Sequence, residues 1–316
     1  MSKRFILSAA ATFMTAALSA QQVQFSTDLD QQNNVINWNV TTSIGGVNVS
    51  PSSFKIGGTV DVKLDSASAP FSTGSLNGSL AFTDPDTLNG SIPNPIPFLP
   101  PLATFKIRDM EFHLSSSTFN IDAAGNFNAM VTLTATTGTN TMGGLFGSGT
   151  EPIFGLGSDP TPVTGRVTQS GSTIQFHLDL NLVVNMDDPS TGITVDIIFN
   201  GPIDAYTDVS EANSMHLDLP MPSLAGSQMN FAYSNAAPNS TVYLAGSLVG
   251  LGSTAVAPLG VVLDLAAPLQ AGVDQANASG GGLFQVNIPI SLAGRSIWGQ
   301  ALQAGRTSNV AGSWVE

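Results

Sequence analysis

Apolar and polar residues alternate with a period of two through long stretches of this chain, and this pattern limits its fold more than any other feature. Between residues 174 and 186 every second residue is apolar, from Ile174 through Leu180 to Met186, and the residues between them are mainly polar. Successive side chains of a β-strand point to opposite faces, so the segment predicts a long strand with one buried face. We find no convincing run with the period of about 3.6 that a helix requires.

The alternating segments come in pairs that are joined by turn residues, which predicts antiparallel hairpins. The turn DDPSTG at 187–192 leads into a second alternating segment at 193–199. In this hairpin we expect the following side chains to be buried: Phe176, Leu180, Val195 and Ile197. Two further pairs are expected, one on each side of the turn DAAGN at 122–126 and one formed by 54–65 with 74–84.

Composition agrees with a chain of strands and turns, because charged residues make up only 10% while Gly and Pro number 32 and 19. We expect an all-β fold: a large antiparallel meander, either a sandwich or an open barrel, followed by a small C-terminal β-sandwich. The expected boundaries are a signal peptide at 1–21, an antiparallel β domain at 22–219, a linker at 220–227 and a β-sandwich module at 228–316. Pro220 and Pro222 mark the linker, because proline cannot donate a hydrogen bond to a sheet.

The N-terminus has the features of a secretory signal. Lys3 and Arg4 precede a short apolar run, and the small residues around Ala20 suit a cleavage site. The run is short for a membrane-spanning helix, so we expect an exported chain without a transmembrane segment, either secreted, periplasmic or on the cell surface. Strands of outer-membrane proteins also alternate, but three Trp and three Tyr are few for the aromatic girdles of such proteins.

Charge and cysteine content exclude several functions. After removal of the signal, seven basic residues face 22 acidic ones, a net charge near −15. A nucleic-acid partner is not expected, because phosphate contacts need clustered Lys or Arg. The chain has no cysteine, which excludes disulfides, thiolate metal sites and cysteine nucleophiles.

Two segments interrupt the alternation, and we expect them to be long loops. They are 84–102, which contains six prolines, and 137–165. Such loops commonly cover a sheet edge or the mouth of a barrel, and some act as lids over a ligand. They carry apolar residues that we expect to be exposed: Ile92, Ile96, Phe98, Leu99, Met142, Leu145, Phe146, Ile153 and Phe154.

The C-terminal part resembles a known kind of module. It contains the turn Asn235-Ala236-Ala237-Pro238, a strand after it, the late run IPISLAGRSIWGQAL and an apolar last strand. In these elements, residues 228–316 resemble a C-terminal β-sandwich module that recurs on secreted and cell-surface proteins of environmental bacteria. The resemblance implies use at the cell surface or outside the cell, and it carries no catalytic residues.

The three histidines of the chain are each followed by leucine, at His113, His177 and His216. His177 with Asp179 and His216 with Asp218 would lie two apart on a polar strand face, and together they could form a zinc-like site if their strands were neighbours. His113 could join through Glu111. Because this spacing is ordinary for a strand, we favour solvated or cross-strand pairs and expect no metal or other cofactor.

Hydrolase signals are absent from the sequence, and nothing in it selects a catalytic pair of aspartates. The segment from Asp84 to Gly90 begins like a calcium loop but lacks the later acidic ligand, so we favour a turn. There is no nucleophile elbow, zinc-protease motif or phosphate loop, and no catalytic residue is assigned. We expect Trp298 to lie in the core and Trp38 to be half-exposed.

The sequence therefore favours an exported, non-enzymatic structural or binding protein of the cell envelope or its surroundings. Its partner could be a surface polymer, a protein or an apolar ligand. The alternative is a carrier whose N-terminal sheet curls around an apolar small molecule. A carrier needs a continuous apolar cavity facing inward, whereas a structural module fills that space with side chains.

Overall fold

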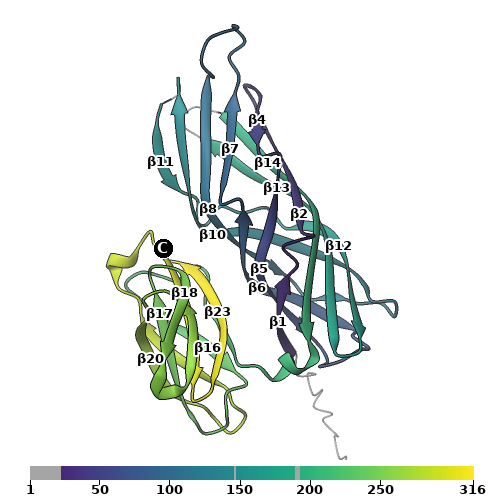
Figure 1. Cartoon of the computed structure of the whole chain (residues 1–316), viewed down its shortest axis with the longest axis vertical. Helices are drawn as coiled ribbons and strands as arrows, with labels where there is room; N and C mark the ends of the chain where they lie inside the picture. Colours follow the sequence, from purple (N-terminus) through teal and green to yellow (C-terminus); the bar gives the residue numbers. More distant parts are fainter. Residues whose placement is uncertain (1–22, 146, 189–192) are drawn as a thin grey trace, which may run out of the picture.

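The computed structural model describes residues 23–145, 147–188 and 193–316 of the 316-residue chain. The predicted signal peptide therefore lies outside the described residues. The described part is built almost entirely from antiparallel strands, as the alternation predicts, with a large sheet and three smaller ones (Figure 1). The described helical segments are three short 3-10 helices, η1 (Val209–Asn213), η2 (Ala257–Leu259) and η3 (Ile290–Leu292).

The large sheet contains fourteen strands. The first seven are β1 (Val23–Leu29), β2 (Val35–Thr42), β3 (Gly45–Gly46), β4 (Asn48–Ser50), β5 (Ser53–Leu64), β6 (Thr73–Asp84) and β7 (Thr87–Ile92). The others are β8 (Ala103–Ser116), β9 (Phe119–Asn120), β10 (Asn126–Gly144), β11 (Gly149–Pro152), β12 (Thr161–Ser170), β13 (Thr173–Asp188) and β14 (Ile193–Asp208).

The large sheet closes on itself. From β10 the hydrogen-bonded order runs through β12, β13, β14, β1, β5, β6 and β8, and β8 pairs again with β10. The three predicted hairpins are all present, as β13 with β14, β8 with β10, and β5 with β6. Closure pairs both sides of the strands in this ring, leaves β3, β4 and β11 as edge strands beside it, and encloses one space for the apolar faces.

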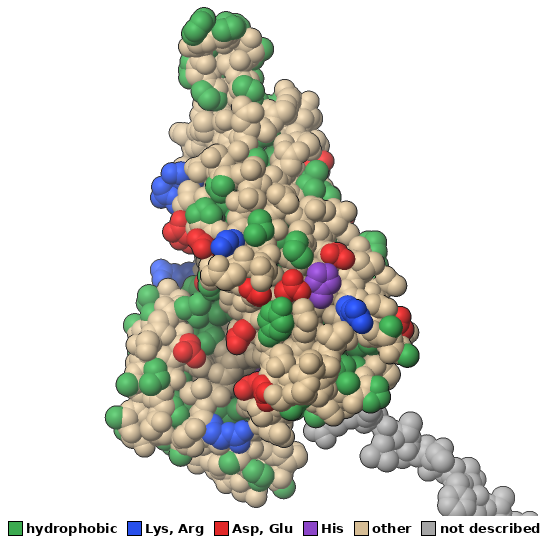
Figure 2. Space-filling model, turned by 45° about the vertical axis from the view of Figure 1, so that its right-hand side comes forward, with side chains coloured by type: hydrophobic (Ala, Val, Ile, Leu, Met, Phe, Trp, Pro, Cys, Tyr) green, Lys and Arg blue, Asp and Glu red, His purple; other side chains and the backbone are tan. Residues whose placement is uncertain are grey.

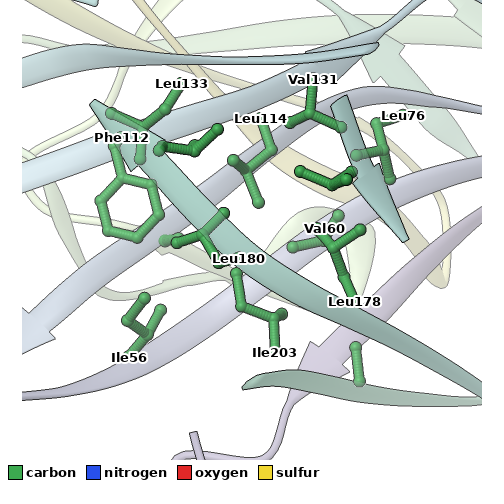
Figure 3. Close-up of a cluster of buried hydrophobic side chains, with 14 of the residues drawn as sticks. Ile56, Val60, Leu76, Phe112, Leu114, Val131, Leu133, Leu178, Leu180 and Ile203 are labelled. Carbon is green, nitrogen blue, oxygen red and sulfur yellow. The ribbon is translucent and has the colours of Figure 1, made fainter. Parts of the chain in front are cut away.

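Apolar side chains from all sides fill this enclosed space. The sticks of Figure 3, including Ile56, Leu114, Leu180 and Ile203, come from strands around the sheet and point toward one another. Phe176, Leu180 and Ile197 are buried as predicted, and Val195 is partly buried against the same cluster. Trp38, predicted to be half-exposed, is instead buried at 3% exposure, and its indole N–H donates to the carbonyl of Pro51.

The prediction of two long loops is wrong for much of their length. Within 84–102 the chain forms β7, which pairs with β8, and within 137–165 it forms the end of β10, all of β11 and the start of β12. The end of β10 and β11 expose residues on both faces, so they have no apolar alternation to reveal them. The connections at 93–102 and 153–160 remain loops, and the first of them forms the far end of the molecule (Figure 1).

The C-terminal part forms three small sheets. Its strands are β15 (His216–Asp218), β16 (Gln228–Ser234), β17 (Thr241–Ser247), β18 (Leu251–Val256), β19 (Val261–Leu265), β20 (Leu269–Gln275), β21 (Gly282–Asn287), β22 (Ser296–Gln303) and β23 (Arg306–Trp314). They are ordered as β15-β16-β21, β20-β17-β22-β23 and β18-β19. Two apolar clusters lie among them.

Residues 215–223, which join the large sheet to the C-terminal part, pair and pack with the C-terminal strands. Residues 216–218 pair with β16, and Met215 and Leu217 are buried in the C-terminal cluster. Ser223, within the predicted linker, is fully buried and forms a parallel bridge with Val315. That the segment 228–316 folds as a separate domain stays a prediction.

Candidate functional site

The histidine pairs that the sequence singled out lie in separate sheets. His177 lies on the outer face of β13, where its Nδ1 is 2.9 Å from Asp204 Oδ1 on the neighbouring strand and its Nε2 is 3.4 Å from Asp179 Oδ1. This is the cross-strand pair that the strand pattern favours. His216 lies in β15 of the C-terminal part, in a different sheet.

His216 differs from its prediction in one respect, because its side chain is buried rather than on a polar face. Burial lowers its pKa, against the opposing effects of Asp218 and of backbone groups of Gln24 and Glu211. Across the described ranges, no three His, Cys, Asp or Glu side chains are grouped so that they could hold a metal ion. Asp84, at the end of β6, accepts a hydrogen bond from Gln31 between β1 and β2, and Asp86, in the turn before β7, accepts one from Thr87.

The two parts of the molecule meet along a seam of polar side chains. Asn309 of β23 donates to Asp61 of β5 over 3.1 Å, and Trp298 of β22 donates its indole N–H to Glu111 of β8 over 3.0 Å. Asp218 accepts from Asn77 over 2.9 Å. Leu80 of β6 packs among the C-terminal apolar residues around Trp298, which is buried as predicted.

Asp61 is the most perturbed group of this seam. It lies between the inward-pointing Val60 and Val62, so its side chain points outward, where the C-terminal part covers it and leaves 7% exposed. Burial raises the pKa of Asp61 from 3.8 to about 7, and Asp218 adds to the rise while Lys63 opposes it. Glu111 has a raised pKa for the same main reason, its burial.

A cavity of about 430 Å³ lies at the seam, lined by Asp61, His113 and Asp218 among other residues. Burial lowers the pKa of His113 from 6.5 to about 4, so the ring is neutral at pH 7. A carboxyl group that titrates near pH 7 could exchange protons with a ligand, but Oδ2 of Asp61 is engaged by Asn309 and Oδ1 is buried in protein. The raised pKa of Asp61 therefore predicts that the contact between the two parts is sensitive to pH.

A second feature is a group of exposed apolar residues at the far end of the large sheet. We call Ile96, Phe98, Leu99 and Leu145 the apolar tip; their exposed fractions are 59%, 105%, 51% and 76%. Ile96, Phe98 and Leu99 belong to the β7–β8 loop, and Leu145 follows β10. Hydrophobic side chains gather at this end in the space-filling view (Figure 2).

The loops of the apolar tip are held together by backbone hydrogen bonds. The Leu145 N–H donates to the Leu102 carbonyl over 2.8 Å, and the Leu102 N–H donates to the Ile92 carbonyl over 2.9 Å. The Asn94 side chain accepts from the Ile96 N–H and donates to the Pro100 carbonyl. Asn94 thus bridges the base of the loop and fixes the residues between.

Sequence reasoning found the residues of the apolar tip but not the seam. Exposure was predicted correctly for Ile96, Phe98, Leu99, Met142 and Leu145, whereas Ile92 and Ile153 are buried at 8% and 5% exposure. Phe154 is intermediate in exposure, and Phe146 lies outside the described residues. No sequence signal marks Asp61, Glu111 or Asn309, because each is a polar residue at an ordinary strand position.

Comparisons with known proteins give no relative from which a function could be transferred. No family model matches the chain, and no curated protein matches it. Among solved structures, Salmonella alpha-2-macroglobulin reacted with methylamine is 9% identical, with a TM-score of 0.26, over 94% of this chain and 32% of that one. Escherichia coli alpha-2-macroglobulin activated by porcine elastase is 10% identical, with a TM-score of 0.22. The chain thus spans about a third of the length of these proteins.

Proposed function

We propose that this protein is an exported, non-enzymatic binding protein of the cell envelope or its surroundings, and that it contacts its target through the apolar tip. The observation that carries the proposal is the exposure of Ile96, Phe98, Leu99 and Leu145 together at one end of the molecule. Water-soluble proteins rarely leave large apolar side chains clustered in the open, and such clusters commonly mark interaction sites.

The packed interior favours contact through the surface over transport of a ligand inside. A carrier would need an apolar cavity within the closed sheet, and that space holds the buried cluster around Leu114 and Leu180. Two further surface cavities, of about 580 and 590 Å³, have polar side chains in their walls. Export rests on the predicted signal peptide.

Retention on a phenyl column tests whether the apolar tip is the dominant apolar surface. Replacing Phe98 with Asn and Leu99 with Ser should shorten retention clearly, because both side chains are solvent-exposed. Leu269→Ser is the matched control, since Leu269 is 74% exposed on β20 of the C-terminal part. Equal retention of wild type and tip variant would remove the basis of the proposal.

Titration with an apolar fluorescent dye distinguishes a carrier from a protein that binds through its surface. A carrier binds the dye at one saturable site per chain, and this site is unaffected by the tip substitutions. Surface binding predicts no such stoichiometric site. Binding of one dye molecule per chain in both the wild type and the tip variant would favour the carrier.

A further inference from the structure

We propose that the target of the apolar tip is the interfacial region of a zwitterionic lipid bilayer, an inference that rests on the proposed function and adds the class of partner. Four properties of the tip support it: its position, its backbone hydrogen bonding, its lack of charge and the conformation of Phe98.

The apolar tip is convex and stands at one end of the long axis of the molecule (Figures 1 and 2). A protruding apolar end can enter a deformable lipid surface, whereas a protein partner would need a matching hollow. Interfacial insertion reaches about 5–10 Å below the headgroups, a depth that suits a loop and not a whole strand.

The backbone of the tip has few free donors to leave water. Of the nine residues 93–101, five are prolines, which have no N–H. Two of the remaining N–H groups are already bonded within the loop: the Ile96 N–H donates to Asn94 Oδ1, and the Leu99 N–H donates to the Ile96 carbonyl. Unpaired backbone N–H and C=O groups oppose transfer into hydrocarbon, so the few free donors lower this cost, and the remaining carbonyls suit the polar interfacial region of a bilayer.

No charged side chain would have to lose water on insertion. The segments 87–105 and 123–150, which include both loops of the tip, contain no Asp, Glu, Lys or Arg. The chain as a whole has a formal net charge of −13. At low salt this net charge repels anionic lipids, and the tip has no cluster of basic residues that would attract them. The partner surface is therefore zwitterionic.

Phe98 is held out toward solvent in a strained conformation. Its φ is 72°, in the left-handed region that bulky residues rarely adopt, and its side chain is fully exposed. The side chain gains no packing inside the protein in return for this strain. Strained residues that persist without internal benefit tend to occur at functional sites, and an aromatic ring is well suited to the lipid–water interface.

Flotation of the full-length mature protein with phosphatidylcholine vesicles tests the inference. Wild type and Leu269→Ser should float with the vesicles, and binding should be nearly independent of salt. The double variant Phe98→Asn, Leu99→Ser should bind at least about tenfold more weakly, because it loses two of the four inserted side chains. Vesicles that contain phosphatidylglycerol should bind less protein at low salt.

The outcomes separate this inference from the proposed function. Tip-dependent retention on the phenyl column without flotation of the wild type would overturn the bilayer as partner and leave the proposed function standing. Stronger binding to phosphatidylglycerol vesicles, or equal flotation of the double variant, would also overturn it. Tip-dependent dimers in analytical ultracentrifugation, with no flotation, would assign the tip to a second copy of the chain instead.

Discussion

Replacing Asp61 with Asn should stabilise the protein strongly at pH 8 and hardly at all at pH 4. Asn has nearly the same shape, can still accept the hydrogen bond from Asn309, and carries no charge at any pH. In the wild type, burial makes the ionised carboxylate of Asp61 unfavourable and raises its pKa to about 7. The substitution removes this cost at every pH at which Asp61 is ionised in the unfolded chain.

The raised pKa of Asp61 determines how its contribution to stability changes with pH. Because the folded protein holds the proton more tightly than the unfolded chain, stability from this group is full below pH 3.8 and is lost as the pH rises to about 7. A rise of about 3 units corresponds to about 4 kcal/mol at 1.36 kcal/mol per unit. For a chain of this size, that difference should raise the melting temperature at pH 8 by roughly 8 °C.

His113 shapes the rest of the pH profile. Its pKa is lowered to about 4, so its contribution is full above pH 6.5 and is lost as the pH falls toward 4. The effects of Asp61 and His113 therefore oppose each other between pH 4 and 6.5, which flattens the wild-type profile. In Asp61→Asn the loss from His113 toward acid pH is no longer offset by Asp61, and stability should fall more steeply between pH 6.5 and 4 than in the wild type.

Calorimetric melting of wild type and variant at several pH values between 4 and 8 measures both effects. Asp28→Asn is the control, because Asp28 is exposed on β1, the strand next to β5. It should leave the melting temperature nearly unchanged. A gain for Asp61→Asn that is the same at pH 4 and pH 8, or no gain at pH 8, would refute the assignment of a buried, uncharged Asp61 to the seam.

Three further predictions follow from packing and backbone conformation. Phe98→Asn should raise the free energy of unfolding by about 0.5–1 kcal/mol in urea titration, because Asn tolerates φ near 72° and the lost ring makes no internal contacts; a loss of stability would contradict the strain. Leu180→Asp should cost several kcal/mol, since Leu180 is 2% exposed within the closed sheet, and a melting temperature within two degrees of wild type would show that the face assignment is wrong. A fragment 215–316 should give a dispersed amide spectrum and melt at higher temperature than 228–316, which lacks β15 and the buried Met215; equal melting would mean that β15 adds nothing to the C-terminal core.

The sequence predicted the strands whose two faces differ in polarity. In β13, alternation identified Phe176 and Leu180 as inward-facing, and both are buried. Strand pairing also followed, because the turns between alternating segments allow only antiparallel neighbours. The end of β10 and β11 were missed because both of their faces meet solvent, so their residues carry no contrast between faces.

The seam was beyond prediction for a different reason. Asp61 occupies a polar position of an alternating strand, and such positions are normally solvated. It is buried only because the C-terminal part, almost 250 residues away at Asn309, covers that face. His216 was misjudged in the same way. The apolar tip could be predicted because proline-rich, uncharged sequence with isolated large apolar residues has no inward face to hide them.

Insertion of residue 98 into lipid is the most direct test of how this protein is proposed to work. The three native tryptophans, Trp38, Trp298 and Trp314, are all less than 9% exposed, so a Phe98→Trp variant carries one additional indole in the open. With phosphatidylcholine vesicles brominated along the acyl chains, the variant should show a blue-shifted emission and quenching that the wild type lacks. An emission spectrum of the variant that is unchanged by the brominated vesicles would contradict the account.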